Sequence, residues 1–230
     1  MNQQPSDSFN DPAGFAWRVA RTGVLALATL SVAACGGSLF ESNMPVPTRY
    51  VIAPAPPAQE PVASAASNVD LAIGNPDVAP GLESPRIAVL RGRELDYYRN
   101  AQWGGSLRET VQALLIATLQ DQKLFRSVAA EQARISNTYL LDPEVRDFQA
   151  EYVDGKAAPE VRVTLVGRVI RVRDRRLIDT LNASATASAT DNRMTAVSAA
   201  FEAAAQQVAL QLARDAATAI ANDAGAAAAQ

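Results

Sequence analysis

The sequence contains no histidine and only one cysteine, Cys35. Histidine is the commonest general acid–base group and the commonest metal ligand, so its absence removes most proton-transfer and metal chemistry. The chain has two lysines, Lys123 and Lys156, and neither stands in a Ser-x-x-Lys pattern. It also lacks the glycine-rich loops that bind phosphates and dinucleotides. We therefore expect no catalytic residues, no cofactor and no metal, and interpret the protein as a non-enzyme.

A charge excess of either sign is also missing, because 21 basic and 24 acidic residues leave a formal net charge of −3. A nucleic-acid-binding domain is usually clearly basic, so this balance predicts no nucleic-acid partner. Once the one cysteine is modified, as argued next, no thiol is left for a disulfide, and the fold must be held by its hydrophobic core.

Cys35 ends a stretch that is typical of an export signal. Arg18 and Arg21 precede an uncharged run from Thr22 to Ala34, which spans only about 20 Å as a helix, against a bilayer core of about 30 Å. Val-Ala-Ala-Cys at its end resembles a bacterial lipobox, which predicts lipidation of Cys35. An ordinary signal peptide with an incidental cysteine is the alternative. The long stretch before the arginines favours a true start downstream of Met1.

Composition divides the rest of the chain. Residues 1–34 are expected to be a lipoprotein signal peptide, and residues 35–47, which are small, polar and proline-bearing, a tether. Residues 48–222 form a single predicted domain, interrupted at 54–67 by a Pro/Ala-rich insertion that we expect to be flexible. Residues 223–230 have nothing to pack against and are predicted to fray.

Strand-like and helix-like patterns alternate within this domain. Ser106-Leu107-Arg108-Glu109 matches a capping box, and the apolar residues that follow recur at helical spacing as far as Lys123. A second, alanine-rich helix is predicted for residues 194–222. Strands are predicted at residues 48–52, 70–74, 86–90, 94–98, 124–128, 138–141, 146–153, 161–171 and 177–190.

This order predicts an α+β fold in which two long helices pack on one face of a largely antiparallel sheet. The expected turns at Arg91-Gly92-Arg93 and Asp174-Arg175-Arg176 favour hairpins, whereas Asp142-Pro143 is expected to break the chain between two strands.

Several stretches resemble one known family, the ABC-type transport auxiliary lipoproteins, and in particular their PqiC-like group. The resemblance also includes the lipobox and extends from Cys35 to about Asn222. The residues that carry it are Arg49–Ile52, Ser84–Val89, Leu95–Trp103, Leu107, Val111–Leu114 and Leu124–Val128.

The resemblance implies a function that the residues alone do not give. Members accompany an MCE-domain protein and an ABC permease and ATPase that move lipids across the bacterial envelope, and several copies can form a ring. We therefore expect a non-catalytic accessory subunit, lipid-anchored at the periplasmic face of the outer membrane. Gly36, where an aspartate would oppose export to that membrane, fits this expectation.

Five residues are candidate partner contacts: Tyr97, Tyr98, Trp103, Arg171 and Arg173. The adjacent tyrosines must face opposite sides if they lie in a strand, so one is expected in the core and one at a surface. Trp103 precedes the capped helix, and a core anchor is the reading that we favour over a partner contact. The arginines could meet an acidic partner or lipid headgroups, although a solvated strand end is the simpler account.

Two other functions remain open at this point. A structural envelope lipoprotein that assists outer-membrane protein or lipopolysaccharide assembly would have the same signal and anchor. A hydrolase that uses carboxylates would require an acidic pair in a concave pocket.

Overall fold

The computed structural model describes residues 46–57, 66, 68–153 and 155–228. The predicted signal peptide, Cys35 and nearly all of the predicted tether therefore lie outside the described residues. The described part is a mixed nine-stranded sheet with two helices, which confirms the α+β class. Its elements are β1 (Thr48–Tyr50), β2 (Asp70–Ile73), β3 (Asp77–Val78), β4 (Arg86–Arg91), β5 (Glu94–Trp103), α2 (Leu107–Asp121), β6 (Ser127–Ala130), a 3₁₀ turn (Glu131–Ala133), β7 (Tyr139–Tyr152), β8 (Glu160–Arg171), β9 (Arg176–Ser188) and α3 (Met194–Ala228).

The sheet is organised around β7, the longest strand. One edge of β7 pairs antiparallel with β8, which in turn pairs antiparallel with β9. The other edge pairs parallel with β2, β3 and β4 in succession. β5 returns antiparallel along β4, while β1 and β6 add parallel to β5 and β2. The sheet is therefore mixed: its longest pairings are antiparallel as predicted, and its short ones are largely parallel.

Pro143 does not break the chain, because Tyr139–Tyr152 is one continuous strand. The carbonyls of Leu141 and Val145 accept bonds from Gly74 and Ala79, on the β2 and β3 side. The backbone of residue 143 points to that same side, since alternate residues of a strand do so. There β2 has ended at Ile73 and β3 begins only at Asp77. Proline has no backbone N–H to donate. At this position none is needed, because this edge of the strand faces the gap between β2 and β3.

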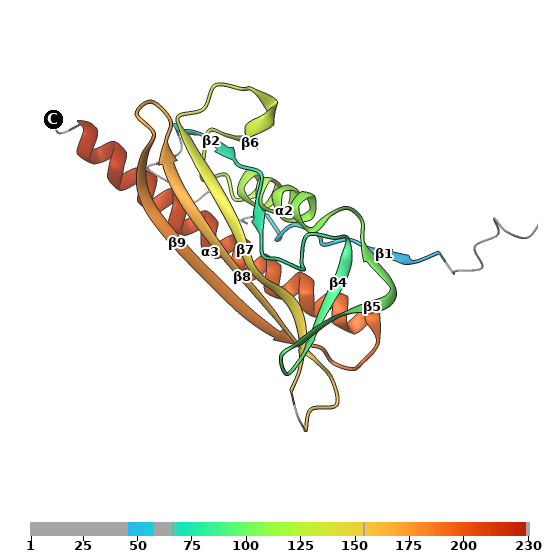
Figure 1. Cartoon of the computed structure of the whole chain (residues 1–230). Helices are drawn as coiled ribbons and strands as arrows, with labels where there is room; N and C mark the ends of the chain where they lie inside the picture. The colour runs from blue at the N-terminus through green and yellow to red at the C-terminus, as the bar shows by residue number, and fades with distance from the viewer. Residues whose placement is uncertain (1–45, 58–65, 67, 154, 229–230) are drawn as a thin grey trace, which may run out of the picture. The chain divides into compact units, whose positions relative to one another are not determined.

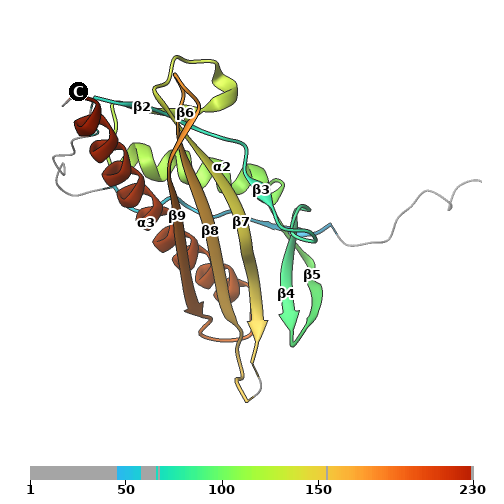
Figure 2. The ribbon, with the colours of Figure 1, turned by 60° about the vertical axis from the view of Figure 1, so that its left-hand side comes forward.

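Both helices lie on the same face of the sheet, as predicted (Figures 1 and 2). α2 begins with the expected capping box, in which Ser106 and Glu109 bond each other's backbone amides. α3 packs over β8 and β9 through a buried stripe that includes Phe201, Val208 and Leu212. Gly167 of β8 permits this approach, because a β-carbon there would lie 3.3 Å from a methyl of Leu212 and 2.8 Å from one of Leu141.

Two predicted boundaries need correction. α3 continues to Ala228, so residues 223–228 are helical, and Asp223 is held by side-chain contacts described below. The segment 54–67 is not wholly a free insertion. Ala55 and Ala66 are buried, and the amide of Ala55 donates to the hydroxyl of Thr118 at 3.3 Å. The small side chains of Ala55 and Ala66 let these two described residues be buried, although the composition of residues 54–67 predicts a flexible insertion.

Candidate partner-binding site

The β4–β5 hairpin holds two of the predicted contact residues, and its strands are not evenly matched. Arg86 pairs with Gln102 and Ala88 with Tyr97, so β5 carries a bulge between these positions. Asn100 lies in the bulge with a φ of 56°. Asparagine tolerates this left-handed conformation better than most residues. The bulge lines an open hollow of about 300 Å³ that includes Arg86, Tyr97 and Arg99.

Tyr97 is half-buried and is fixed from two sides. Its hydroxyl donates to the carbonyl of Gly81 at 2.7 Å, and the guanidinium of Arg86 lies 3.6 Å from the centre of its ring. A cation at this distance from an aromatic face is attracted by the electron density of the ring. Gly81 has a φ of 88°, which permits the turn that meets the tyrosine. Arg86 therefore belongs to this site, although the sequence had marked it only as part of the family resemblance.

Tyr98 faces a different set of neighbours, as the strand alternation predicts. Its hydroxyl lies 3.4 Å from that of Tyr152, which donates in turn to the side-chain oxygen of Asn192. The guanidinium of Arg91 lies 4.8 Å from the ring of Tyr152. Burial, reinforced by the hydrogen bond to Tyr152, raises the pKa of Tyr98. Tyr97 and Tyr98 are thus both half-buried, and neither is wholly core or wholly surface.

Trp103 lies in the core, which is the reading that we favoured. It is 2% exposed and meets Phe148 and Phe201 edge-on, at ring-centre distances of 5.7 and 5.1 Å. Phe148 and Phe201 stack on each other at 5.4 Å. This side chain is therefore not exposed to a partner in the described structure, and its role as a contact is corrected.

Arg171 is also buried, because two carboxylates from different elements enclose it. Its guanidinium lies 2.8 Å from Asp174 in the β8–β9 turn and 2.8 Å from Asp223 of α3. The pKa of Arg171 is raised mainly by its hydrogen-bonded ion pair with Asp174. Tyr139 donates to Asp223 at 2.7 Å, and burial together with this bond raises the pKa of Tyr139 to about 12.

Arg171 therefore ties the end of the sheet to the end of α3. Arg173, two residues further, is exposed. Of the two predicted arginine contacts, only Arg173 presents its charge to solvent.

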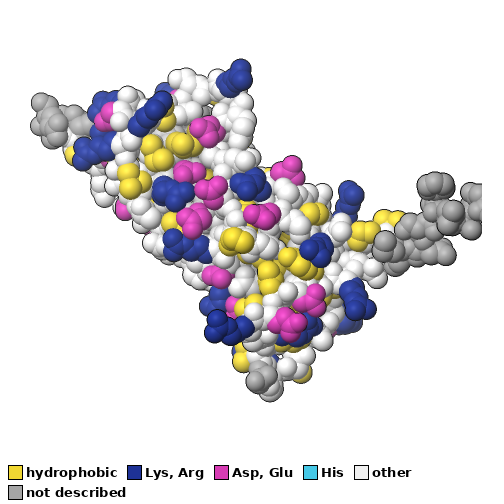
Figure 3. Space-filling model, viewed as in Figure 1, with side chains coloured by type: hydrophobic (Ala, Val, Ile, Leu, Met, Phe, Trp, Pro, Cys, Tyr) yellow, Lys and Arg dark blue, Asp and Glu magenta, His cyan; other side chains and the backbone are white. Residues whose placement is uncertain are grey.

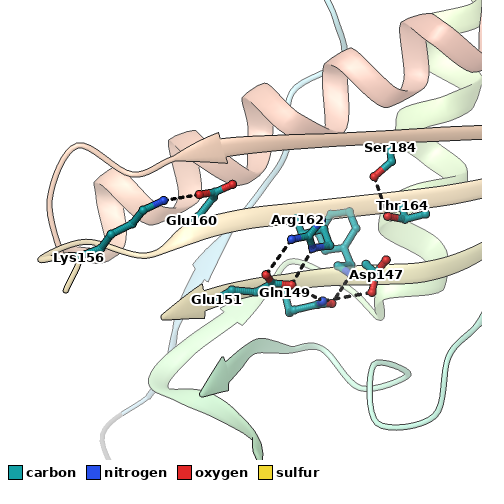
Figure 4. A network of polar contacts seen from close by, with 9 residues as sticks. Asp147, Gln149, Glu151, Lys156, Glu160, Arg162, Thr164 and Ser184 are labelled. Atoms are coloured by element: carbon teal, nitrogen blue, oxygen red, sulfur yellow. Dashed lines mark hydrogen bonds and ion pairs between the residues drawn. The ribbon is translucent and has the colours of Figure 1, made fainter. Parts of the chain in front are cut away.

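The face of the sheet opposite the helices is polar. Figure 3 shows charges of both signs spread across it. Arg162 donates to Glu151 at 2.8 Å, and Gln149 bridges Asp147 and Glu151 (Figure 4). Further along the face, Arg168 binds Asp142 and Glu144 at 3.0 and 3.1 Å.

Two carboxylates on this face, Glu144 and Glu160, are poorly suited to act as a catalytic acid. Arg146, and to a lesser extent Arg168, lowers the pKa of Glu144, and Lys156 lowers that of Glu160. A catalytic acid near neutral pH requires the opposite shift. Among the described residues no cluster of three or more acidic or cysteine side chains could hold a metal ion.

An apolar groove of about 460 Å³ runs between β1 and α2. Tyr50, Val51 and Ile52 form one wall and the α2 residues Ala113, Leu114 and Ala117 form the other. Val51 is 77% exposed at its rim. No sequence pattern indicated this groove, since it arises from the parallel docking of β1 on β5. Neither described helix is long and apolar enough to cross a bilayer.

Comparison with known proteins agrees with this fold. The family model described as "ABC-type transport auxiliary lipoprotein component" matches residues 50–213. Protein XCC0632 from Xanthomonas campestris has a similar structure, with a TM-score of 0.67, 25% identity, and coverage of 78% of this chain and 98% of its own. An uncharacterized protein is similar in fold, with a TM-score of 0.57, 14% identity, and coverage of 74% of this chain and 99% of its own.

No curated protein matches the sequence. The family match nevertheless covers more than half of the chain, and it runs from β1 into α3 through every strand and helix between them. The chain therefore belongs to the family of ABC-type transport auxiliary lipoprotein components.

Proposed function

We propose that this protein is a non-catalytic accessory subunit of an MCE-type lipid transport system, anchored by lipid on Cys35 to the periplasmic face of the outer membrane. Its partners would be an MCE-domain protein and the ABC permease and ATPase, which supply the energy. The observation that carries the proposal is the family match over residues 50–213. The lipobox ending in Cys35, followed by Gly36, supports the anchor and its destination.

The described surfaces fit a role in contact better than a role in chemistry. Carboxylates on the open face of the sheet are held by arginines, and both hollows described above are open to solvent. The hairpin hollow combines aromatic and arginine side chains, which are enriched where proteins bind each other. Within the proposal, this hollow contacts the MCE partner, and the apolar groove beside β1 offers a wall to an acyl chain.

Capture from envelope extract tests the partnership. The tagged full chain is cross-linked in cells and purified, and we expect an MCE-domain protein and the ABC subunits to be enriched. Arg99→Glu, which reverses an exposed charge at the hairpin hollow, should reduce their recovery by about tenfold, as a loss of about 1.4 kcal/mol in binding would. Arg214→Glu makes the same change at an exposed position of α3 and should leave recovery unchanged.

Enrichment of outer-membrane β-barrel or lipopolysaccharide assembly proteins, without the MCE protein, would instead support the structural envelope function. If the partners are recovered equally with Arg99→Glu and Arg214→Glu, the partnership is supported but the contact does not lie at the hairpin. Arg173→Glu, at the distant β8–β9 turn, then tests the other predicted contact.

A further inference from the structure

The face of the sheet that the helices leave open is polar over most of its length, but one end of it is apolar. Ile170 of β8 pairs with Leu140 of β7 on one side and with Leu177 of β9 on the other. Residues paired in this way point to the same face of a sheet. Arg171 reaches Asp223 of α3, so its neighbour Ile170 points away from the helices. The three side chains therefore form an aliphatic row on the open face.

This row continues onto the turn between β8 and β9, where it is exposed. The amide of Val172 donates to the carbonyl of Thr138 at 3.0 Å, so Val172 extends β8, and strand alternation places its side chain on the open face. Val172 is 42% exposed and Leu177 is 53% exposed. The loop between β6 and β7 lies at the same end of the molecule, and its Ile135 is 58% exposed (Figures 1 and 2). Exposed hydrophobic side chains are ordinary when scattered but indicate a binding surface when they gather.

Arginines without an acidic partner surround these side chains. Figure 3 shows basic side chains beside hydrophobic ones at the end of the molecule that carries the β8–β9 turn. The four exposed arginines that make no ion pair with a described residue are Arg134, Arg173, Arg175 and Arg176. Asp174, the acid in the same turn, is bound by Arg171. Only Glu131 and Asp179 are left as unpaired acids in these two segments, so the free charge at this end is basic although the chain has a formal net charge of −3.

We propose that this end of the sheet binds the surface of a membrane that contains anionic phospholipids. The binding surface, here called the tip patch, consists of the exposed aliphatic side chains and the four arginines just described. Arginine lays its methylene groups on apolar surface while its guanidinium binds phosphate oxygens. Aliphatic side chains between the arginines can enter the boundary between headgroups and acyl chains. The tip patch contains no aromatic residue, whereas aromatic residues are enriched in protein interfaces, and this favours a lipid surface over an acidic protein.

This contact is separate from the functions proposed above. It requires no transporter subunit, so it does not depend on the proposed function. It also differs from the predicted lipid anchor, because salt screens the attraction between exposed charges and leaves acyl chains in place. A chain that is already anchored holds its tip patch at a high local concentration near the membrane. A weak affinity is therefore enough to determine which end of the domain faces the lipid.

Co-sedimentation with vesicles tests the contact. The protein is the chain from residue 35 onward with Cys35→Ser, which keeps every described residue and carries no lipid. We expect it to bind vesicles of phosphatidylglycerol and phosphatidylcholine in equal parts at low salt, and not to bind vesicles of phosphatidylcholine alone. Raising the salt concentration should release it. Residues 1–34 contain two arginines and two aspartates, so the shortened chain keeps the net charge of −3, which alone would cause repulsion.

Two matched pairs of variants locate the contact. Arg176→Glu reverses a charge of the tip patch and should lower vesicle binding by about tenfold, whereas Arg214→Glu, on the outer side of α3, should leave it unchanged. Val172→Ser should lower binding several-fold because it removes apolar surface. Val153→Ser changes a valine that is 46% exposed beyond the other end of β7, and it should have no effect. All four positions are exposed, so the melting temperatures should match that of the parent chain.

Three results would overturn the proposal. A chain that does not bind the anionic vesicles would leave an acidic protein as the partner of these arginines. Equal binding to both kinds of vesicle would show that charge has no part in it. Equal binding by the two members of either variant pair would show that the contact lies elsewhere on the chain.

Discussion

Three aromatic side chains from distant parts of the chain meet in the centre of the molecule. Trp103 comes from β5, Phe148 from β7 and Phe201 from α3, and each is at most 2% exposed. Edge-on and stacked ring contacts add to the free energy that their burial contributes. The cluster therefore joins the hairpin that carries Tyr97 and Tyr98 to both the central strand and the long helix.

Trp103→Ala should lower the free energy of unfolding by roughly 3–5 kcal/mol, because it opens a cavity among side chains that cannot fully close it. Denaturant unfolding followed by circular dichroism measures the change. A variant with unchanged stability and lost partner capture would show that the ring acts at an interface.

Tyr139 makes stability depend on pH in the alkaline range. Its pKa is about 12 in the folded protein, above the value near 10 expected for an unfolded chain. The folded state therefore holds its proton more tightly, and this contribution to stability is complete below pH 10 and is lost as the pH rises toward 12. Tyr139→Phe should flatten this part of the stability profile, measured by urea unfolding at pH 9 to 12. An unchanged slope would contradict the assignment.

Local signals explain why some elements could be predicted. The capping box fixes the start of α2 because both of its hydrogen bonds lie within four residues. The apolar stripe of α3 is also local, and so are the hairpin turns. The single strand β7 was missed, since Pro143 is tolerated only because it lies where β2 has ended and β3 has not yet begun. The parallel pairings of β1 and β2 depend on contacts distant in sequence, which no local pattern specifies.

The candidate site divides in the same way. Tyr97 and Tyr98 could be placed on opposite sides from strand alternation alone. The burial of Arg171 could not be predicted, because Asp223 was assigned to a frayed tail and its approach requires α3 to continue past Asn222. Arg86 carried no separate signal, as its place over the Tyr97 ring depends on the bulge in β5.

The cap of α2 gives an element-level prediction. Ser106→Ala removes the side-chain acceptor for the Glu109 amide and should cost about 1 kcal/mol of stability. Ser198→Ala is the matched control, because this serine lies within α3 and its hydroxyl donates to the carbonyl of Thr195. Its effect should stay within about 0.5 kcal/mol. Thermal melts of the two variants under identical conditions measure this difference. Equal losses of stability in both variants would show that the cap has no special role.

At the scale of the whole molecule, the anchor and the domain should be separable. Every described core residue lies at position 55 or later, whereas the predicted lipid is attached at Cys35. Cys35→Ser should therefore release the protein from membranes and leave its melting temperature unchanged. Stable attachment needs several acyl chains, and the variant would carry none of them. We therefore expect no variant protein in the salt-washed membrane fraction. A variant that stays with membranes after a high-salt wash would refute lipid anchoring.

The path by which the chain enters the domain has a mechanical consequence. At the end of β1 the carbonyl of Tyr50 accepts from Gly104 at 2.9 Å, and beyond it Ala53 donates to Glu202 at 3.0 Å and Ala55 donates to Thr118. Tension applied through a membrane anchor and directed along β1 would load these bonds together with the β1–β5 ladder, in shear. The load would be shared among β5, α2 and α3 before any part of the aromatic core was disturbed. If the predicted tether transmits the pull of a moving partner, the domain should bear it without first unfolding from its N-terminal end.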